Sequence, residues 1–184
     1  FLIKAKTKQS EEQTSFSFFK NSNMNLIWLG VICFCCMASE GIMFDWSGVY
    51  FHDVVKAPEE LVILGYASFM IMMATGRFIG DFVVGRFGRQ RTLQVSGILM
   101  FVGMLASVIF PNLWVGTLAF MLVGLGVACN VPTVYSVAGK HKKIPAGVAL
   151  AMVSSISFLG FLMGPPLIGY IAELFSLRYS FALF

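Results

Sequence analysis

Charged side chains are scarce in this sequence of 184 residues, where Asp, Glu, Lys and Arg together make up 12%. An average soluble domain is about 25% charged and about 45–50% apolar. Here the hydrophobic share is 58% and the mean hydropathy is +0.82. This composition excludes an ordinary soluble domain and predicts a protein whose surface faces lipid.

Motifs for catalysis and metal binding are also missing. The sequence has no G-x-S-x-G nucleophile motif, no H-E-x-x-H zinc motif and no phosphate-binding glycine loop. Its four cysteines all lie inside apolar runs, where cysteine is typical of core packing. We therefore expect no enzyme, no cofactor and no metal. The basic residues lie in short loops rather than on one basic face, so we expect no nucleic-acid partner.

Five apolar runs of membrane-spanning length dominate the sequence. They cover residues 24–44, 61–80, 92–110, 113–138 and 146–172, and the start of a sixth follows. About 20 apolar residues span the bilayer as a helix, which satisfies its own backbone hydrogen bonds in lipid. The predicted fold is therefore all-α, a polytopic membrane bundle over residues 24–184. Residues 1–23 are polar and basic and are predicted to be a linker.

Basic residues are divided unequally between the two ends of the predicted spans. If the ends alternate between sides, one side holds eleven Lys and Arg and the other holds only Lys56 and Arg178. Basic loops stay in the cytoplasm. We therefore expect residues 1–23, 81–91 and 139–145 on the cytoplasmic side of a multi-pass protein of the inner membrane. Because the sequence starts with Phe and stops inside an apolar run, we also expect it to be a fragment of a longer chain.

The stretch "GRFIGDFVVGRFGRQR", residues 76–91, concentrates four arginines, one aspartate and four glycines between the second and third spans. One interpretation is a topology signal in which only total positive charge matters. The other is a tight cytoplasmic loop whose residue order matters, because glycines let the two helices approach closely. In this second interpretation Asp81 needs a cationic partner, for which Arg86, Arg89 and Arg91 are the neighbouring candidates.

The order of residues in this stretch resembles the signature loop of the major facilitator superfamily, with extra residues between Asp81 and Arg86. Three further segments are similar to the branch related to fucose/proton symporters. "EGIMFDWSGVYF" resembles its seventh helix, "GLGVACNVPTVYSVAGK" its tenth, and "SFLGFLMGPPLIGYIAELFSLRYSF" its eleventh and the start of its twelfth. The resemblance covers residues 24–184 in order. It implies the C-terminal half of a transporter, without the N-terminal half.

The resemblance implies secondary active transport of a small solute by alternating access, and we expect proton-coupled symport of a sugar-like substrate. The partners would be the substrate, the proton, the lipid bilayer and the N-terminal half of the same transporter. Residues 76–91 would latch the halves as a cytoplasmic gating loop, through Gly76, Arg77, Gly80, Asp81, Arg86, Gly88, Arg89 and Arg91. Two alternatives stay open: a drug/proton efflux antiporter, and a non-transporting membrane scaffold or receptor module.

Polar residues inside the spans are the candidates for substrate or proton binding. Glu40 lies well inside the first span, where a carboxylate is costly and faces a bundle interior or a wet cavity. It could carry a proton or serve as a structural hydrogen-bonding group. Asp45 lies closer to the outer end, and Tyr66 is a further candidate. Asn130 and Thr133 share a face of the fourth span and could meet a substrate hydroxyl or hold helices together.

Proline and glycine predict irregular helices in the last two complete spans. Pro132 has no backbone N–H, so it leaves the Ala128 carbonyl without its helical donor and predicts a kink. In the fifth span the predicted helix bend combines glycines with a pair of prolines: Gly160, Gly164, Pro165 and Pro166.

Overall fold

The computed structural model describes residues 24–141 and 144–182, and within these ranges the regular elements are helices, with no strand. The helices are α2 (Met24–Asp53), α3 (Ile63–Phe87), α4 (Arg89–Ile109), α5 (Leu113–Ala128), α6 (Asn130–Ala138), α7 (Ala146–Leu174) and α8 (Leu177–Ala182), with a 3₁₀ turn η1 (Glu59–Leu61) before α3. The predicted linker, residues 1–23, lies outside the described residues, as do Lys142 and Lys143.

Five helical segments are long and apolar enough to cross a membrane: Met24–Asp53, Glu59–Phe87, Arg89–Ile109, Leu113–Ala138 and Ala146–Leu174. They confirm the predicted all-α bundle of five spans. The first helix continues to Asp53, although its apolar run ends near residue 44. Helical hydrogen bonds need no apolar side chains, so a helix extends past the hydrophobic stretch into the interface.

The prediction of a loop over residues 81–91 is wrong. α3 continues through Phe87 and α4 begins at Arg89, so Gly88 alone separates them. Gly88 has φ 80° and ψ 156°, a conformation that glycine adopts readily and other residues rarely do. Its N–H donates to the Val84 carbonyl at the end of α3. Arg86, Arg89 and Arg91 therefore lie on two helix ends that meet at one glycine.

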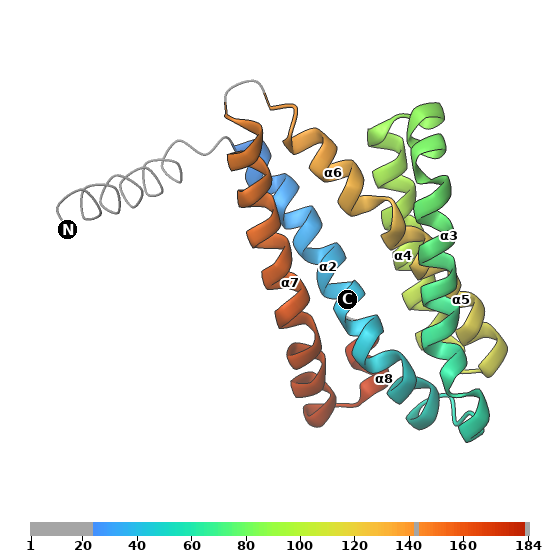
Figure 1. The fold of residues 1–184 in the computed structure, drawn as a ribbon. Coiled ribbons are helices and arrows are strands. Elements are labelled where there is room, and N and C mark those ends of the chain that lie inside the picture. Colours follow the sequence, from blue (N-terminus) through green and yellow to red (C-terminus); the bar gives the residue numbers. More distant parts are fainter. Residues whose placement is uncertain (1–23, 142–143, 183–184) are drawn as a thin grey trace, which may run out of the picture.

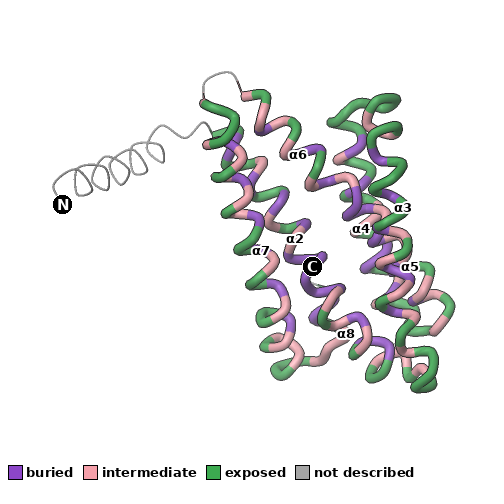
Figure 2. Tube along the Cα trace, in the orientation of Figure 1, coloured by how far each residue is buried: buried purple, intermediate pink, exposed green. Residues whose placement is uncertain are grey.

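Two helices form the centre of the bundle. The most apolar windows of α2 and of α5–α6 are both 56% buried, against 28% for α3 and for α4. α7 packs along α2, whereas α3 and α4 both pack on α5 (Figure 1). Figure 2 shows the buried positions on the faces where these helices meet. The α3–α4 junction, the end of α6 and the start of α7 share one end of the bundle, as alternation of the spans requires.

The crossing of α2 and α7 is close because α7 presents glycines to the backbone of α2. A Cβ on Gly160 would collide with the Phe34 carbonyl oxygen, and one on Gly164 would lie 2.6 Å from the Ala38 carbonyl oxygen. α7 continues through Pro165 and Pro166 as one helix to Leu174. The Pro165 carbonyl also accepts a hydrogen bond of 3.1 Å from Trp46 Nε1 of α2, which ties the two helices together.

The fourth span is interrupted where Pro132 predicts a kink. α5 ends at Ala128, Cys129 has φ −94° and ψ −12°, and α6 starts at Asn130. Helical hydrogen bonding continues across the break with the Thr133 N–H, which donates to the Cys129 carbonyl at 3.2 Å. The interruption places two polar residues of α6, Asn130 and Thr133, in the buried middle of the bundle.

Candidate functional site

An ion pair between two spans is the main feature of the bundle interior. Nη2 of Arg77, on α3, donates to Oε1 of Glu40, on α2, at 3.1 Å. Glu40 is 5% exposed, whereas the Arg77 side chain is 52% exposed. The pair therefore joins a buried anion to a cation that still reaches open space.

Arg77 was expected in the cytoplasmic loop, and this placement is wrong. It lies ten residues before the end of α3, about 15 Å along the helix from Phe87 at 1.5 Å per residue. The arginine lies within the span because Glu40 of the neighbouring helix supplies its counter-charge. The sequence did hold a signal for this pair: Glu40 and Arg77 both lie inside predicted spans that follow one another, and opposite charges inside neighbouring spans tend to pair.

Glu40 is only half satisfied by this pairing. Its second oxygen, Oε2, is buried and has no hydrogen-bond partner among the described residues. A buried acceptor without a donor is costly, since it has lost its water and gained no partner. The site therefore offers one carboxylate oxygen that can take a proton or accept a hydrogen bond from a ligand.

Asn130 connects α6 to two other helices beside this site. Its Nδ2 donates to Cys36 Sγ of α2 at 3.5 Å and to Met100 Sδ of α4 at 3.4 Å. Cys36 lies one helical turn before Glu40, on the same side of α2. The amide oxygen Oδ1 of Asn130 is buried without a hydrogen-bond partner among the described residues. These contacts suit a residue that holds helices together, and they leave one amide oxygen for a ligand.

A small pocket of about 130 Å³ lies between α3 and the α5–α6 break. Its walls include Arg77, Asp81, Arg89 and Thr133. Pro132 and Ser136 also line it from α6. The fold thus brings three charged residues of the 76–91 stretch into one pocket with Thr133 of the fourth span.

Other predicted contacts do not form. No ion pair links Asp81 to the candidate partners Arg86, Arg89 or Arg91 among the described residues. Arg86 lies five positions after Asp81 on a continuous helix, which turns the two side chains about 140° apart. Asp45 is exposed and makes no ion pair within the described part of the chain.

Tyr66 is not part of the Glu40 site. It is 39% exposed, and its ring packs against Phe44 with centroids 6.1 Å apart. Its phenol makes no hydrogen bond to another described residue that would orient it toward Arg77 or Glu40. Packing therefore explains its position on α3.

Comparison with known proteins identifies the family of the chain. The family model described as Major Facilitator Superfamily matches residues 3–143, well over half of the chain. An uncharacterized MFS-type transporter of Yersinia pestis is 33% identical over 85% of this chain and 41% of its own length. Membrane protein MosC of Rhizobium meliloti is 36% identical over 82% of this chain and 37% of its own length. The chain therefore spans about two fifths of these relatives.

Two more distant relatives have names that state a substrate or a resistance. A D-xylose transporter of Levilactobacillus brevis is 28% identical over 67% of this chain and 32% of its own length. A lincomycin resistance protein of Streptomyces lincolnensis is 30% identical over 56% of this chain and 21% of its own length.

The fold is also similar to a solved transporter structure. A crystal structure of the peptide transporter POT in complex with sulfate superposes with a TM-score of 0.76 at 20% identity, over 86% of this chain and 34% of the other. At that identity the likeness concerns the fold alone. The family match, the relatives and the five spans agree, and this multi-pass membrane chain belongs to the Major Facilitator Superfamily, whose members are transporters and not enzymes.

Proposed function

We propose that the chain is the C-terminal half of a secondary transporter that couples proton entry to uptake of a small, sugar-like solute. One observation carries this proposal: Glu40 is buried inside a span, pairs with Arg77 through Oε1 and has no partner for Oε2 among the described residues. An ionisable residue inside a membrane span is by default a functional candidate. The share of the relatives that the chain covers is consistent with one half of a two-half transporter.

The ion pair suggests how protonation would change the site. While Glu40 is charged, Coulomb attraction holds the Arg77 guanidinium against α2. When Oε2 takes a proton, that attraction weakens and the half-exposed arginine can turn toward the pocket that it lines. Protonation would thus change the charge that a substrate meets beside Thr133. In a transporter built from two halves, such a change can favour one orientation of the halves over the other.

Polar atoms near the ion pair support a hydroxylated substrate. Oδ1 of Asn130 accepts no hydrogen bond among the described residues, and the Thr133 hydroxyl lines the pocket. Both can bond to sugar hydroxyls, and the D-xylose transporter among the relatives favours this substrate class. The lincomycin resistance relative favours drug/proton antiport as the second candidate. A non-transporting scaffold would need no buried carboxylate with a free oxygen.

The decisive experiment is transport by the full-length protein in liposomes that carry a pH indicator. We expect an inward proton gradient to drive accumulation of a radiolabelled pentose or hexose, and the added sugar to acidify the lumen. If lincomycin instead moves against the direction of proton flow, the protein is an antiporter and the symport proposal is wrong. Absence of any coupled flux across a panel of sugars and drugs would support the scaffold alternative.

We further propose that the α3–α4 junction and residues 139–145 face the cytoplasm of an inner-membrane protein. The α3–α4 junction and the end of α6 lie at one end of the bundle, and the turn between α2 and η1 lies at the other (Figure 1). Arg86, Arg89 and Lys140 belong to the first end by their positions in the sequence, and Lys56 belongs to the second. Basic residues of this kind stay on the cytoplasmic side. A cysteine at Lys140 that reacts from the periplasm, beside a protected one at Lys56, would reverse the orientation.

Asp81→Asn is expected to lower the transport rate while leaving membrane expression normal. Asp81 is exposed on α3, so its carboxylate is available to a helix N-terminus of the proposed N-terminal half. Its loss would destabilise the state that is closed to the cytoplasm. Arg86→Lys should act in the same direction but more weakly, because lysine keeps the charge and loses the planar fork of donors. Normal transport by both variants would reduce the stretch to a topology signal.

A further inference from the structure

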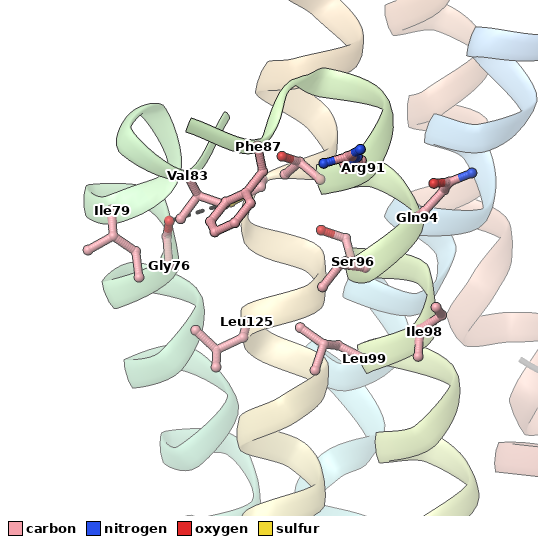
Figure 3. A pocket seen from close by; sticks show the side chains of 13 residues that line it. Gly76, Ile79, Val83, Phe87, Arg91, Gln94, Ser96, Ile98, Leu99 and Leu125 are labelled. Carbon is pink, nitrogen blue, oxygen red and sulfur yellow. Dashed lines mark hydrogen bonds between the residues drawn. The ribbon is translucent and has the colours of Figure 1, made fainter. Parts of the chain in front are cut away.

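A larger pocket of about 490 Å³ lies between α3 and α4, with α5 as its floor (Figure 3). Its walls are apolar: Ile79, Val83 and Phe87 come from α3, and Val95, Ile98 and Leu99 come from α4. Ile79, Phe87, Val95 and Ile98 are each about half exposed, so the pocket is a groove that opens to the exterior of the described chain. We call it the α3–α4 groove.

The groove exists because α3 and α4 pack on α5 far more than on each other. α3 approaches α5 closely at Gly76, where a Cβ would lie 2.6 Å from the Cβ of Ala128. α4 approaches it at Gly126, where a Cβ would lie 2.7 Å from the Ser96 carbonyl oxygen. These two close contacts draw both helices onto α5 and leave the space between their outer faces unfilled.

The groove is distinct from the site around Glu40, although Cys129 lines both the groove and the small pocket. Gly76 and Ile79 line the groove, whereas Arg77 and Gly80 line the small pocket. Gly76 directly precedes Arg77, and Ile79 directly precedes Gly80. Consecutive residues on a helix point in directions about 100° apart. The two cavities therefore lie on different flanks of α3, and the proposed transport site does not use the groove.

One end of the groove is cationic. Arg91 lines it, and Figure 3 places Arg91 near Phe87, whereas Leu99 and Leu125 lie farther along the groove. Arg86 is also exposed at this end of the bundle, as is Arg89, which lines the small pocket rather than the groove, and none of the three arginines makes an ion pair within the described ranges. The groove thus combines an apolar length with a terminal positive charge.

The start of α4 adds to this positive potential. Its first turn holds arginines and no acidic residue, and no side chain caps it. The N-terminal end of a helix carries a partial positive charge, which repels cations and attracts anions. An anion beside Arg91 would meet both its guanidinium and the positive end of α4.

We propose that the α3–α4 groove binds an anionic phospholipid, with an acyl chain along the groove and the phosphate at Arg91 and the first turn of α4. The groove runs along α3 from Gly76 to Phe87, about 16 Å at 1.5 Å per residue. One leaflet contributes about half of the 30 Å hydrocarbon core, so the length matches one leaflet. Lipid is the apolar molecule that meets an open groove on a membrane-spanning bundle, and the arginines select an anionic headgroup.

The proposal is tested by native mass spectrometry of the full-length protein, purified in detergent and titrated with phosphatidylglycerol or phosphatidylcholine of the same chain length. We expect phosphatidylglycerol to bind more tightly than phosphatidylcholine. Arg91→Gln should weaken phosphatidylglycerol binding about fivefold, the effect of one basic residue near an anionic lipid surface. Lys56→Gln, an exposed charge at the other end of the bundle, is the matched control and should change little.

A second variant tests the groove itself. Val95→Trp fills it and should lower binding of phosphatidylglycerol, whereas Val102→Trp places the same side chain about two turns farther along α4, at an exposed position that does not line the groove. Equal binding of both lipids to the wild type would overturn the proposal, as would equal effects of the two tryptophans. Displacement of the bound lipid by inorganic phosphate at the same concentration would assign the arginines to a free anion instead.

Discussion

Glu40→Gln is expected to abolish proton-driven accumulation of substrate while leaving substrate binding and downhill exchange in place. Glutamine resembles the protonated side chain, with one acceptor oxygen and one donor group in the same shape, but it cannot take up or release a proton. Both activities can be measured in one preparation of liposomes: accumulation of substrate under a proton gradient, and exchange of substrate without a gradient. The exposed Glu173, near the end of α7, supplies the control Glu173→Gln, which should transport normally.

Arg77→Gln is expected to lower the stability of the protein. Comparing it with Glu40→Gln separates a role in proton coupling from a role in holding the fold together. It leaves the Glu40 carboxylate buried without its cation, a change that costs about 3–5 kcal/mol for a fully buried pair and less here because Arg77 is half exposed. We expect a lower yield of folded protein and a lower melting temperature.

The double variant, Glu40→Gln with Arg77→Gln, removes both charges. It should recover the melting temperature without recovering proton-driven accumulation. If Glu40→Gln alone accumulates substrate like the wild type, the carboxylate is structural and the coupling site lies elsewhere. If the double variant stays as unstable as Arg77→Gln, the arginine stabilises the fold through contacts other than Glu40.

Gly160→Leu is expected to disrupt the packing of α7 on α2 and to lower the melting temperature strongly. A Cβ at this position already collides with the Phe34 carbonyl oxygen of α2, and backbone cannot move aside as a side chain can. Overpacking costs about 1–3 kcal/mol where side chains yield, and we expect more at a backbone contact. The thermal stability of detergent-purified protein, followed by size-exclusion chromatography, gives the comparison.

Gly97→Leu is the matched control for this substitution. Gly97 lies on α4, and a Cβ there would meet nothing within 4 Å. It should therefore keep or slightly exceed the wild-type melting temperature, because its leucine adds the same helix propensity as the leucine at position 160 and meets no neighbour. A Gly160→Leu variant as stable as Gly97→Leu would mean that α2 and α7 do not cross as closely as the structure indicates.

The sequence by itself determined the features that depend on local chemistry. Apolar length set the five spans, since lipid leaves the backbone no partner but itself. Pro132 set the break between α5 and α6, because a missing N–H acts on the carbonyl four residues earlier. Gly88 set the position of the α3–α4 junction through a backbone conformation that other residues avoid. The predicted loop over residues 81–91 was too long, because charged residues can stay in a helix as long as its backbone hydrogen bonds continue.

Only the tertiary structure decided how the polar residues are grouped. Arg77 belongs by sequence to the stretch with Asp81 and Arg86, yet it pairs with Glu40, 37 positions away on another helix. A spanning helix that is apolar almost all round carries little information about which face meets which neighbour, so sequence spacing could not place this contact. Glycines decide which helix faces meet. Those of α7 lie against backbone carbonyls of α2, and others let α3 and α4 pack closely on α5. Those close contacts bring Glu40 to Arg77, and they leave the groove between α3 and α4 open.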